Sequence, residues 1–142
     1  MIADVLADPR PHLVVFDYGA GRGGDWPAIL DRHANIELHC FEPHDASRRD
    51  LAQRLAGRRV TIHPEIDKVS LQADVIVSFS VLEHVYDRPR YLAHAKRLLA
   101  PDGVFHLNYD DGHFRTALDL DGHKGFKVSI ANYLQHRLAG LW

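Results

Sequence analysis

Short apolar runs recur along the chain, and polar or amphipathic segments separate them. Most of these runs contain β-branched residues, which favour an extended backbone. Continuous apolar character over so few residues is typical of strands that are buried on both faces of a sheet. The pattern predicts five strands, at residues 13–16, 36–41, 60–62, 74–78 and 104–107.

Segments with helix start and stop signals lie between these strands. The first predicted helix covers residues 25–33. Asp45 caps the second helix, and Gly57 ends it. Asp87 opens the third helix, and residues 101–103 (PDG) end it. The apolar stripe predicted for this third helix consists of Tyr91, Leu92, Ala95, Leu98 and Leu99.

Strands that alternate with helices predict an α/β fold. Right-handed crossover connections make successive strands parallel, so we expect a doubly wound, mostly parallel, Rossmann-like sheet of about five strands. Residues 1–142 are enough for one core but not for two, and we expect a single domain. In such sheets a ligand binds beyond the carboxyl ends of the strands, where the strand order reverses.

A glycine-rich turn, residues 17–23 (DYGAGRG), follows the first predicted strand. Its glycines allow backbone amides to approach a ligand closely. Gly19, Gly21 and Gly24 also match the dinucleotide pattern G-x-G-x-x-G. The turn by itself therefore leaves two classes of cofactor open.

Two acidic residues at strand ends help to separate these classes. Asp17 directly precedes the glycines, where a carboxylate would repel a pyrophosphate and attract a cationic ligand. Glu42 follows the second strand, and an acidic residue there can bind a ribose diol in either class of cofactor. The alternative interpretations are a helix or turn cap for Asp17 and a surface charge for Glu42.

Four segments together resemble the class I S-adenosylmethionine-dependent methyltransferases of the small-molecule type. Residues 15–23 (VFDYGAGRG) resemble their first motif, and residues 41–43 (FEP) resemble their ribose-binding acidic motif. Residues 74–85 (DVIVSFSVLEHV) resemble the signature after their fourth strand, and residues 98–104 (LLAPDGV) the turn into their fifth. The resemblance implies a Rossmann-like fold, S-adenosylmethionine as the cofactor and methyl transfer as the reaction.

The resemblance also implies which residues bind the cofactor. The loop after the first strand would hold its amino-acid end, and the acidic motif after the second strand would hold its ribose and adenine. The segment after the third strand would add an apolar contact, and the residues after the fourth would line the region near the methyl group. The implied set is Asp17, Tyr18, Gly19, Ala20, Gly21, Glu42, Pro43, Ile66, Phe79 and Ser80.

Two positions depart from the family pattern. Glu65 and Asp67 compete for the acidic position beside the adenine, and Ile66 lies between them. The usual Pro-Gly-Gly turn reads Pro-Asp-Gly at residues 101–103, a sequence that still supports a tight turn.

Methyl transfer requires alignment of the acceptor with the methyl group, and a hydroxyl acceptor also needs a general base. The candidate catalytic residues are His84, Asp110 and His113. His84 has packing or hydrogen bonding as an alternative role, and residues 108–113 (NYDDGH) are rich in turn formers that need carry no chemistry. We expect a small-molecule acceptor with a hydroxyl or an amine, on a sugar or another metabolite.

The composition and charge of the chain argue against some classes of binding partner, such as nucleic acids and metal ions. The 142 residues are 46% hydrophobic and 25% charged, as in ordinary soluble proteins, and a formal net charge of −2 gives no support for nucleic-acid binding. Arginines crowd residues 48–59, but acidic residues lie nearby, so we expect a solvated helix face. The histidines and aspartates from His106 to His123 fit no compact ligand motif, and we expect no metal site.

The single cysteine and the apolar segments indicate where in the cell the protein is expected. Cys40 lies in an apolar run and is expected to be a small buried hydrophobe. No apolar stretch reaches the length of a membrane span, and the N-terminus lacks the pattern of a signal peptide. We therefore expect a cytoplasmic protein that has no membrane partner.

The end of the chain leaves several explanations open. The pattern of residues 127–139 predicts an amphipathic helix, and we expect residues 140–142 to leave no room for the antiparallel strand pair that ends class I methyltransferases. The sheet edge would then be open. A longer native chain, a homo-oligomer or partner chain that covers the edge, and a relic without turnover are the alternatives. An NAD-dependent oxidoreductase cofactor domain and a non-catalytic S-adenosylmethionine-binding module are the competing functions.

Overall fold

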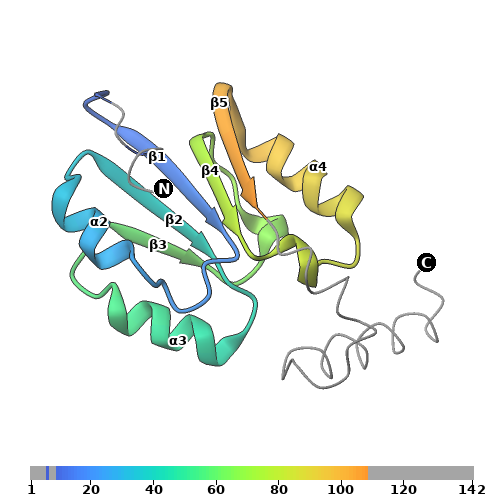
Figure 1. The fold of residues 1–142 in the computed structure, drawn as a ribbon, viewed down its shortest axis with the longest axis horizontal. Coiled ribbons are helices and arrows are strands. Elements are labelled where there is room, and N and C mark those ends of the chain that lie inside the picture. The colour runs from blue at the N-terminus through green and yellow to red at the C-terminus, as the bar shows by residue number, and fades with distance from the viewer. Residues whose placement is uncertain (1–5, 7–8, 109–142) are drawn as a thin grey trace.

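The computed structural model describes Leu6 and residues 9–108 of the chain. The strands in this part form one sheet (Figure 1): β1 (Leu13–Tyr18), β2 (Ile36–Phe41), β3 (Val60–His63), β4 (Ala73–Phe79) and β5 (Leu99–Asn108). Their order in space is β3-β2-β1-β4-β5, and every pair of neighbours is parallel. The predicted doubly wound parallel sheet is confirmed, and the strand order reverses between β1 and β4.

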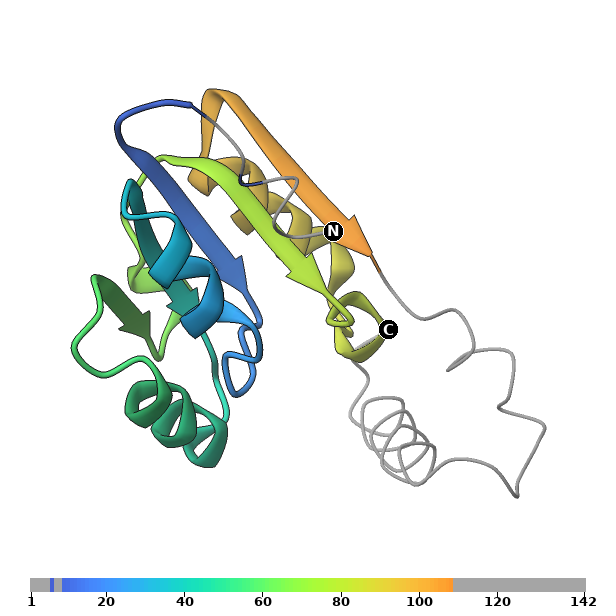
Figure 2. The same cartoon turned by 60° about the vertical axis from the view of Figure 1, so that its left-hand side comes forward.

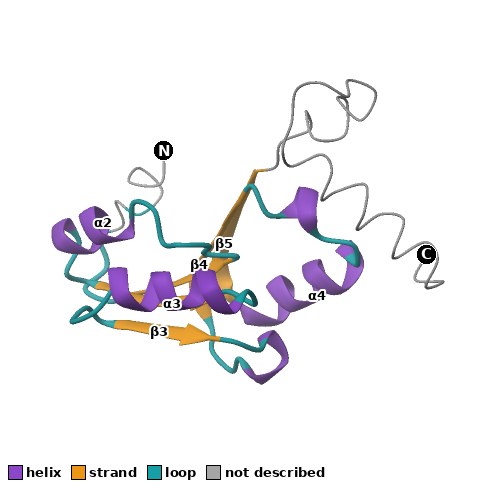
Figure 3. Ribbon diagram, turned by 90° about the horizontal axis from the view of Figure 1, so that it is seen from below, coloured by secondary structure: helices purple, strands orange, loops and turns teal. Residues whose placement is uncertain are grey.

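Helices connect the strands in the described residues: α2 (Trp26–Arg32), α3 (Asp45–Arg54), η1 (Ile66–Lys68), η2 (Leu82–His84) and α4 (Arg88–Leu98). Figure 3 shows α2 and α3 in the half of the molecule that contains β3, and α4 on the side of β5. Between β3 and β4 the connection is reduced to the single 3₁₀ turn η1. No helix in this part of the chain combines the length and the apolar character that crossing a bilayer requires.

Side chains alternate along β1, and this alternation feeds two cores on opposite faces of the sheet. Figure 2 shows α2 on one of these faces and α4 on the other. Leu13 and Val15 face α2 and α3, whereas Phe16 and Tyr18 face α4. The helices contribute Trp26, Ile29 and Leu51 to the first core and Tyr91, Ala95 and Leu98 to the second. All of these side chains are buried.

The helix caps match the sequence signals in part. The Asp87 carboxylate accepts a hydrogen bond from the Arg90 backbone N–H at 2.9 Å and caps α4 as predicted. In α3 the prediction was wrong by one residue, because the His44 imidazole accepts from the Ser47 backbone N–H and takes the capping position. The same helix ends at Arg54, before Gly57.

The fifth strand begins earlier than the sequence predicts. The chain is already extended at Leu99, which pairs with Ala73, so Leu99 does not belong to the α4 stripe. Leu92 also lies outside the buried stripe, since it is 47% exposed. The expected turn at residues 101–103 is an irregularity within β5, where the register shifts. Gly103 permits this close approach, because a Cβ there would lie 2.8 Å from the Ala73 carbonyl oxygen.

Candidate functional site

The loop after β1 is fastened to the end of β2 by its own backbone. The N–H groups of Gly19 and Ala20 both donate to the Phe41 carbonyl oxygen at 3.0 Å. Gly19 has a φ of +101°, and a Cβ at this position would lie 2.5 Å from Val81 Cγ2. Conformation and space therefore both require glycine here.

Glu42 fixes the same loop from the side of β2. It is only 7% exposed, and its Oε2 accepts from the Gly21 N–H while its Oε1 accepts from the His44 N–H, each at 2.8 Å. The interpretation of Glu42 as a surface charge is therefore wrong. Each carboxylate oxygen has a further lone pair, so Glu42 keeps the capacity to accept a hydrogen bond from a ligand.

Asp17 lies on the α2 side of β1, as the alternation of the strand requires. Trp26, which is 3% exposed, donates its indole N–H to Asp17 Oδ2 at 2.6 Å. Burial raises the pKa of the Asp17 carboxyl to about 7, a rise that the Trp26 hydrogen bond opposes and the Glu42 carboxylate increases. A cation bound beside Asp17 would favour its ionised form.

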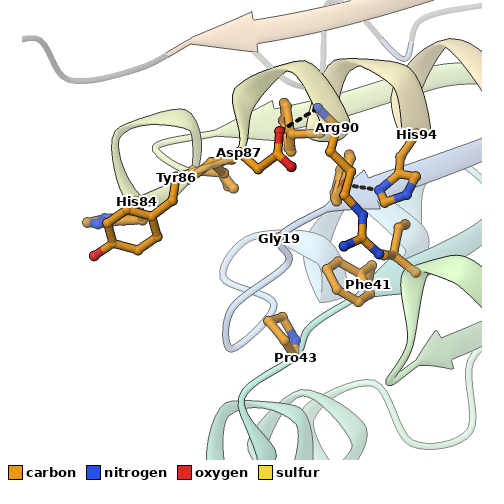
Figure 4. Close-up of a pocket in the computed structure, with 13 residues that line it drawn as sticks. Gly19, Phe41, Pro43, His84, Tyr86, Asp87, Arg90 and His94 are labelled. Carbon is orange, nitrogen blue, oxygen red and sulfur yellow. Dashed lines mark hydrogen bonds between the residues drawn. The ribbon is translucent and has the colours of Figure 1, made fainter. Parts of the chain in front are cut away.

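An apolar pocket of about 480 Å³ lies on the α4 side of the loop (Figure 4). Its walls come from the ends of β1 and β2, from η1, from the segment between β4 and α4, and from α4 itself. Figure 4 shows His84 and Tyr86 at one end of the pocket and Phe41 and His94 at the other, with Gly19 between. Aromatic and aliphatic side chains make up much of its lining, so a flat, apolar group of a ligand could pack against them.

Two stacked tyrosines form an ordered wall of this pocket. The rings of Tyr18 and Tyr91 lie 4.3 Å apart between centroids, and the Tyr18 hydroxyl lies 3.1 Å from His94 Nδ1. The Tyr91 hydroxyl donates to Ser78 Oγ at 2.5 Å. The Ser78 hydroxyl in turn donates to the Tyr18 carbonyl oxygen at 2.9 Å. Burial raises the pKa of both phenols, so they are neutral at physiological pH.

The predicted cofactor residues thus lie on two sides of the loop after β1, the α4 side with the pocket and the α2 side with Asp17. Those that line the pocket are Tyr18, Gly19, Pro43 and Ile66. Those whose hydrogen bonds form the loop and its α2 side are Asp17, Ala20, Gly21 and Glu42.

The two predicted residues at the carboxyl end of β4, Phe79 and Ser80, do not line this pocket. Phe79 packs against the core beneath α2 and α3. Ser80 has a φ of +56°, and its N–H donates to Asn108 Oδ1 at 2.8 Å. This bond ties the carboxyl end of β4 to that of β5. A non-glycine residue with such a φ is uncommon and marks a constrained position.

Of the candidate catalytic residues, His84 lines the pocket. Asp110 and His113 lie outside the described residues. Within the described part of the chain, no group of three or more His, Cys, Asp or Glu side chains could hold a metal ion.

The acidic residues around Ile66 both have surface partners. Glu65 pairs with Lys68 at 2.8 Å. Asp67 pairs with Arg90 at 2.7 Å and with His94 at 3.0 Å, so it joins η1 to α4. The competition between Glu65 and Asp67 for the position beside a ligand stays open.

Several residues of the site were not predicted from the sequence. Trp26 contacts Asp17, Asn108 holds Ser80, and Arg90 and His94 of α4 line the pocket. Tyr91 was expected only as a core residue. The spacing of Arg90, Tyr91 and His94 within one helical turn was the available signal for a shared face.

Comparisons with known proteins point to one family. A family model described as "Methyltransferase domain" matches residues 16–105. Highly reducing polyketide synthase 40 of Fusarium mangiferae is 27% identical over 141 residues, which are 93% of this chain and 6% of that protein. Dimethylglycine N-methyltransferase of Parasynechococcus marenigrum is 31% identical over 109 residues, covering 70% of this chain and 39% of that protein.

A solved structure agrees with these matches. The O-methyltransferase from a trans-AT PKS multienzyme of Brevibacillus brevis, in complex with S-adenosyl-L-homocysteine, superposes with a TM-score of 0.60 at 25% identity. The match covers 66% of this chain and 34% of that one. The chain thus spans well under half the length of each of these proteins.

Gly19→Ala tests the close contact of the loop with Val81. The added methyl group would meet Val81 Cγ2 at 2.5 Å with a φ of +101°. We expect the free energy of unfolding, measured with urea, to fall by about 1–3 kcal/mol. Gly24→Ala is the matched control, because a Cβ there meets nothing within 4 Å, and it should change stability by less than about 0.5 kcal/mol. Equal losses in the two variants would contradict this account.

Asp17→Asn tests the burial of the carboxyl. Because its pKa rises from 3.8 to about 7 on folding, the folded protein loses stability as the pH rises through this range. The variant should therefore be more stable than wild type at about pH 8, by about 1 kcal/mol or more, and the gain should shrink toward about pH 4. Urea denaturation at both pH values measures the difference in the free energy of unfolding between the variant and wild type. Asp31→Asn, at an exposed partner of Arg58, should show no such pH-dependent gain.

Proposed function

This chain belongs to the methyltransferase domain family, and we propose that it transfers a methyl group from S-adenosylmethionine to a hydroxyl or an amine of a small-molecule acceptor. One arrangement carries the proposal. The loop after β1 has a partly buried carboxyl on one side, an apolar pocket on the other, and the Glu42 carboxylate bonded to its backbone.

The residues present fit the chemistry of S-adenosylmethionine. The Asp17 carboxylate suits the ammonium group of the amino-acid end, and the remaining lone pairs of Glu42 suit the ribose hydroxyls. The pocket walls formed by Tyr18, Pro43 and Ile66 suit the flat adenine ring. A dinucleotide would instead bring a pyrophosphate toward two carboxylates, which disfavours the NAD-dependent alternative.

S-adenosylmethionine, when bound, supplies an electrophilic methyl group on a sulfonium. The chain's own contribution is to hold and orient, because alignment of the reacting groups supplies much of the rate enhancement in a displacement. The glycine loop is fixed at Phe41 and Glu42, so hydrogen bonds within the chain itself hold its geometry. We assign to the wall residue His84 the removal of a proton from a hydroxyl acceptor, and Asp110 and His113 are further candidates for that task.

The acceptor class rests on the names of similar proteins. One relative is named for N-methylation of dimethylglycine, and a structural neighbour is named an O-methyltransferase, so both amine and hydroxyl acceptors have support. The polyketide synthase relatives support action within a larger multienzyme, where further chain or a partner covers the β5 edge. We further propose that residues 1–142 act as one cofactor-binding domain, and that the protein is cytoplasmic because its single cysteine, Cys40, is a buried free thiol.

Titration calorimetry and a transfer assay test this function. We expect S-adenosylmethionine and S-adenosylhomocysteine to bind and NAD to show no binding. Methyl transfer should follow with pools of hydroxyl and amine metabolites, and His84→Ala should lower kcat for a hydroxyl acceptor about 100-fold or more while keeping cofactor affinity. Binding of NAD in preference would contradict the proposal. Tight cofactor binding without transfer to any acceptor would favour a non-catalytic binding module.

Glu42→Gln tests the carboxylate that joins the loop to β2. An amide nitrogen in place of one oxygen would face a backbone N–H of Gly21 or His44 and break that hydrogen bond. We expect the Kd of S-adenosylhomocysteine to rise about 10-fold or more. Asp31→Asn makes the same change of charge at an exposed site and should leave the Kd within about twofold. Similar effects from both variants would contradict the role of Glu42.

A further inference from the structure

Trp26 closes the glycine loop through its side chain. It is the first residue of α2, and its indole N–H reaches Asp17 at the end of β1, nine positions earlier. The ring is packed in the core beneath α2 and α3. A buried indole N–H needs an acceptor, and here the acceptor is Asp17 Oδ2 at 2.6 Å.

Apart from Trp26, the described groups near Asp17 do not stabilise its negative charge. Cys40 lies beside it on β2, and burial raises the pKa of that thiol, so it is neutral. Tyr91, in the core on the α4 face, is a neutral phenol, and Glu42 adds a second negative charge. Among the described residues that act on Asp17, the Trp26 indole is the group that favours the ionised carboxyl.

We propose that Trp26 is a positioning residue that orients the Asp17 carboxyl group toward the ammonium group of S-adenosylmethionine, and that cofactor binding ionises Asp17 and releases its proton. The inference rests on the proposed function and goes beyond it. The indole holds Oδ2 and thereby fixes the rotation of the carboxyl group, which presents its other oxygen in one direction. The proton passes to solvent when the ammonium group takes its place.

The affinity for S-adenosylhomocysteine should then depend on pH, whereas a Trp26 side chain that acted through packing alone would give no such dependence. At low pH the cofactor must displace the proton, so S-adenosylhomocysteine should bind wild type more weakly at about pH 6 than at about pH 8. Calorimetry in two buffers of different ionisation enthalpy should detect proton release near neutral pH. Asp17→Asn should bind weakly at every pH and lose this dependence.

Trp26→Phe keeps an aromatic ring in the core and removes the N–H. We expect its affinity for S-adenosylhomocysteine at pH 7 to fall about 5-fold and to come within about twofold of the wild-type value at about pH 8, with the midpoint of the pH profile moved upward by about one unit. Ile29→Ala is the matched control, because Ile29 is buried in the same helix and the same core. It should lower stability and leave the midpoint unchanged.

The outcomes separate this inference from the proposed function. A wild-type protein that binds neither S-adenosylmethionine nor S-adenosylhomocysteine at any pH overturns the function and the inference together. Binding by wild type with a loss in Trp26→Phe that is the same at every pH assigns Trp26 to packing and overturns the inference alone.

A readout without ligand tests the Trp26–Asp17 pair directly. In the ligand-free protein the Trp26 indole N–H resonance should titrate near neutral pH, and Asp17→Asn should abolish that titration. The other tryptophan of the chain, Trp142, provides the reference signal. A Trp26 resonance that does not respond to pH, or that still titrates in Asp17→Asn, overturns the pairing.

Discussion

The alternation of side chains along β1 is the constraint on which the site depends. This strand lies in the middle of the sheet between β2 and β4, and helices cover both of its faces. Its last two residues must therefore point in opposite directions, Asp17 toward α2 and Tyr18 toward α4. The chain turns immediately afterwards at Gly19. A single strand end thus gives a charged side and an apolar side to one binding site.

The two sides meet different physical demands. On the α2 side, a carboxyl is held in surroundings that disfavour its charge, and a second carboxylate, Glu42, is satisfied by backbone N–H groups. Two carboxyl groups so close together, out of full contact with water, cost free energy, and a cationic ligand beside Asp17 would offset part of that cost. On the α4 side the stacked tyrosines stay neutral, which suits an uncharged ring.

Much of this arrangement could be predicted from local sequence signals. The strands could be predicted because strands buried on both faces are apolar and rich in β-branched residues. The loop could be predicted because its backbone conformation and its contact with Val81 require glycine at Gly19, and this glycine is visible in the sequence. The family resemblance, read from four motifs, is confirmed by the family match. The early start of β5 could not be predicted, since it depends on pairing between Leu99 and Ala73 across the sheet. The bond between Trp26 and Asp17 also escaped prediction, because the two residues meet only when the loop between them is folded.

The contact between Gly19 and Val81 has a mechanical consequence. Val81 directly precedes η2, which contains His84, and its methyl groups occupy the space that a side chain on residue 19 would need. Two loops that are distant in sequence are thus in contact with no gap between them. Neither loop can move toward the other without a clash, so the glycine loop and the segment that leads to His84 limit each other's position.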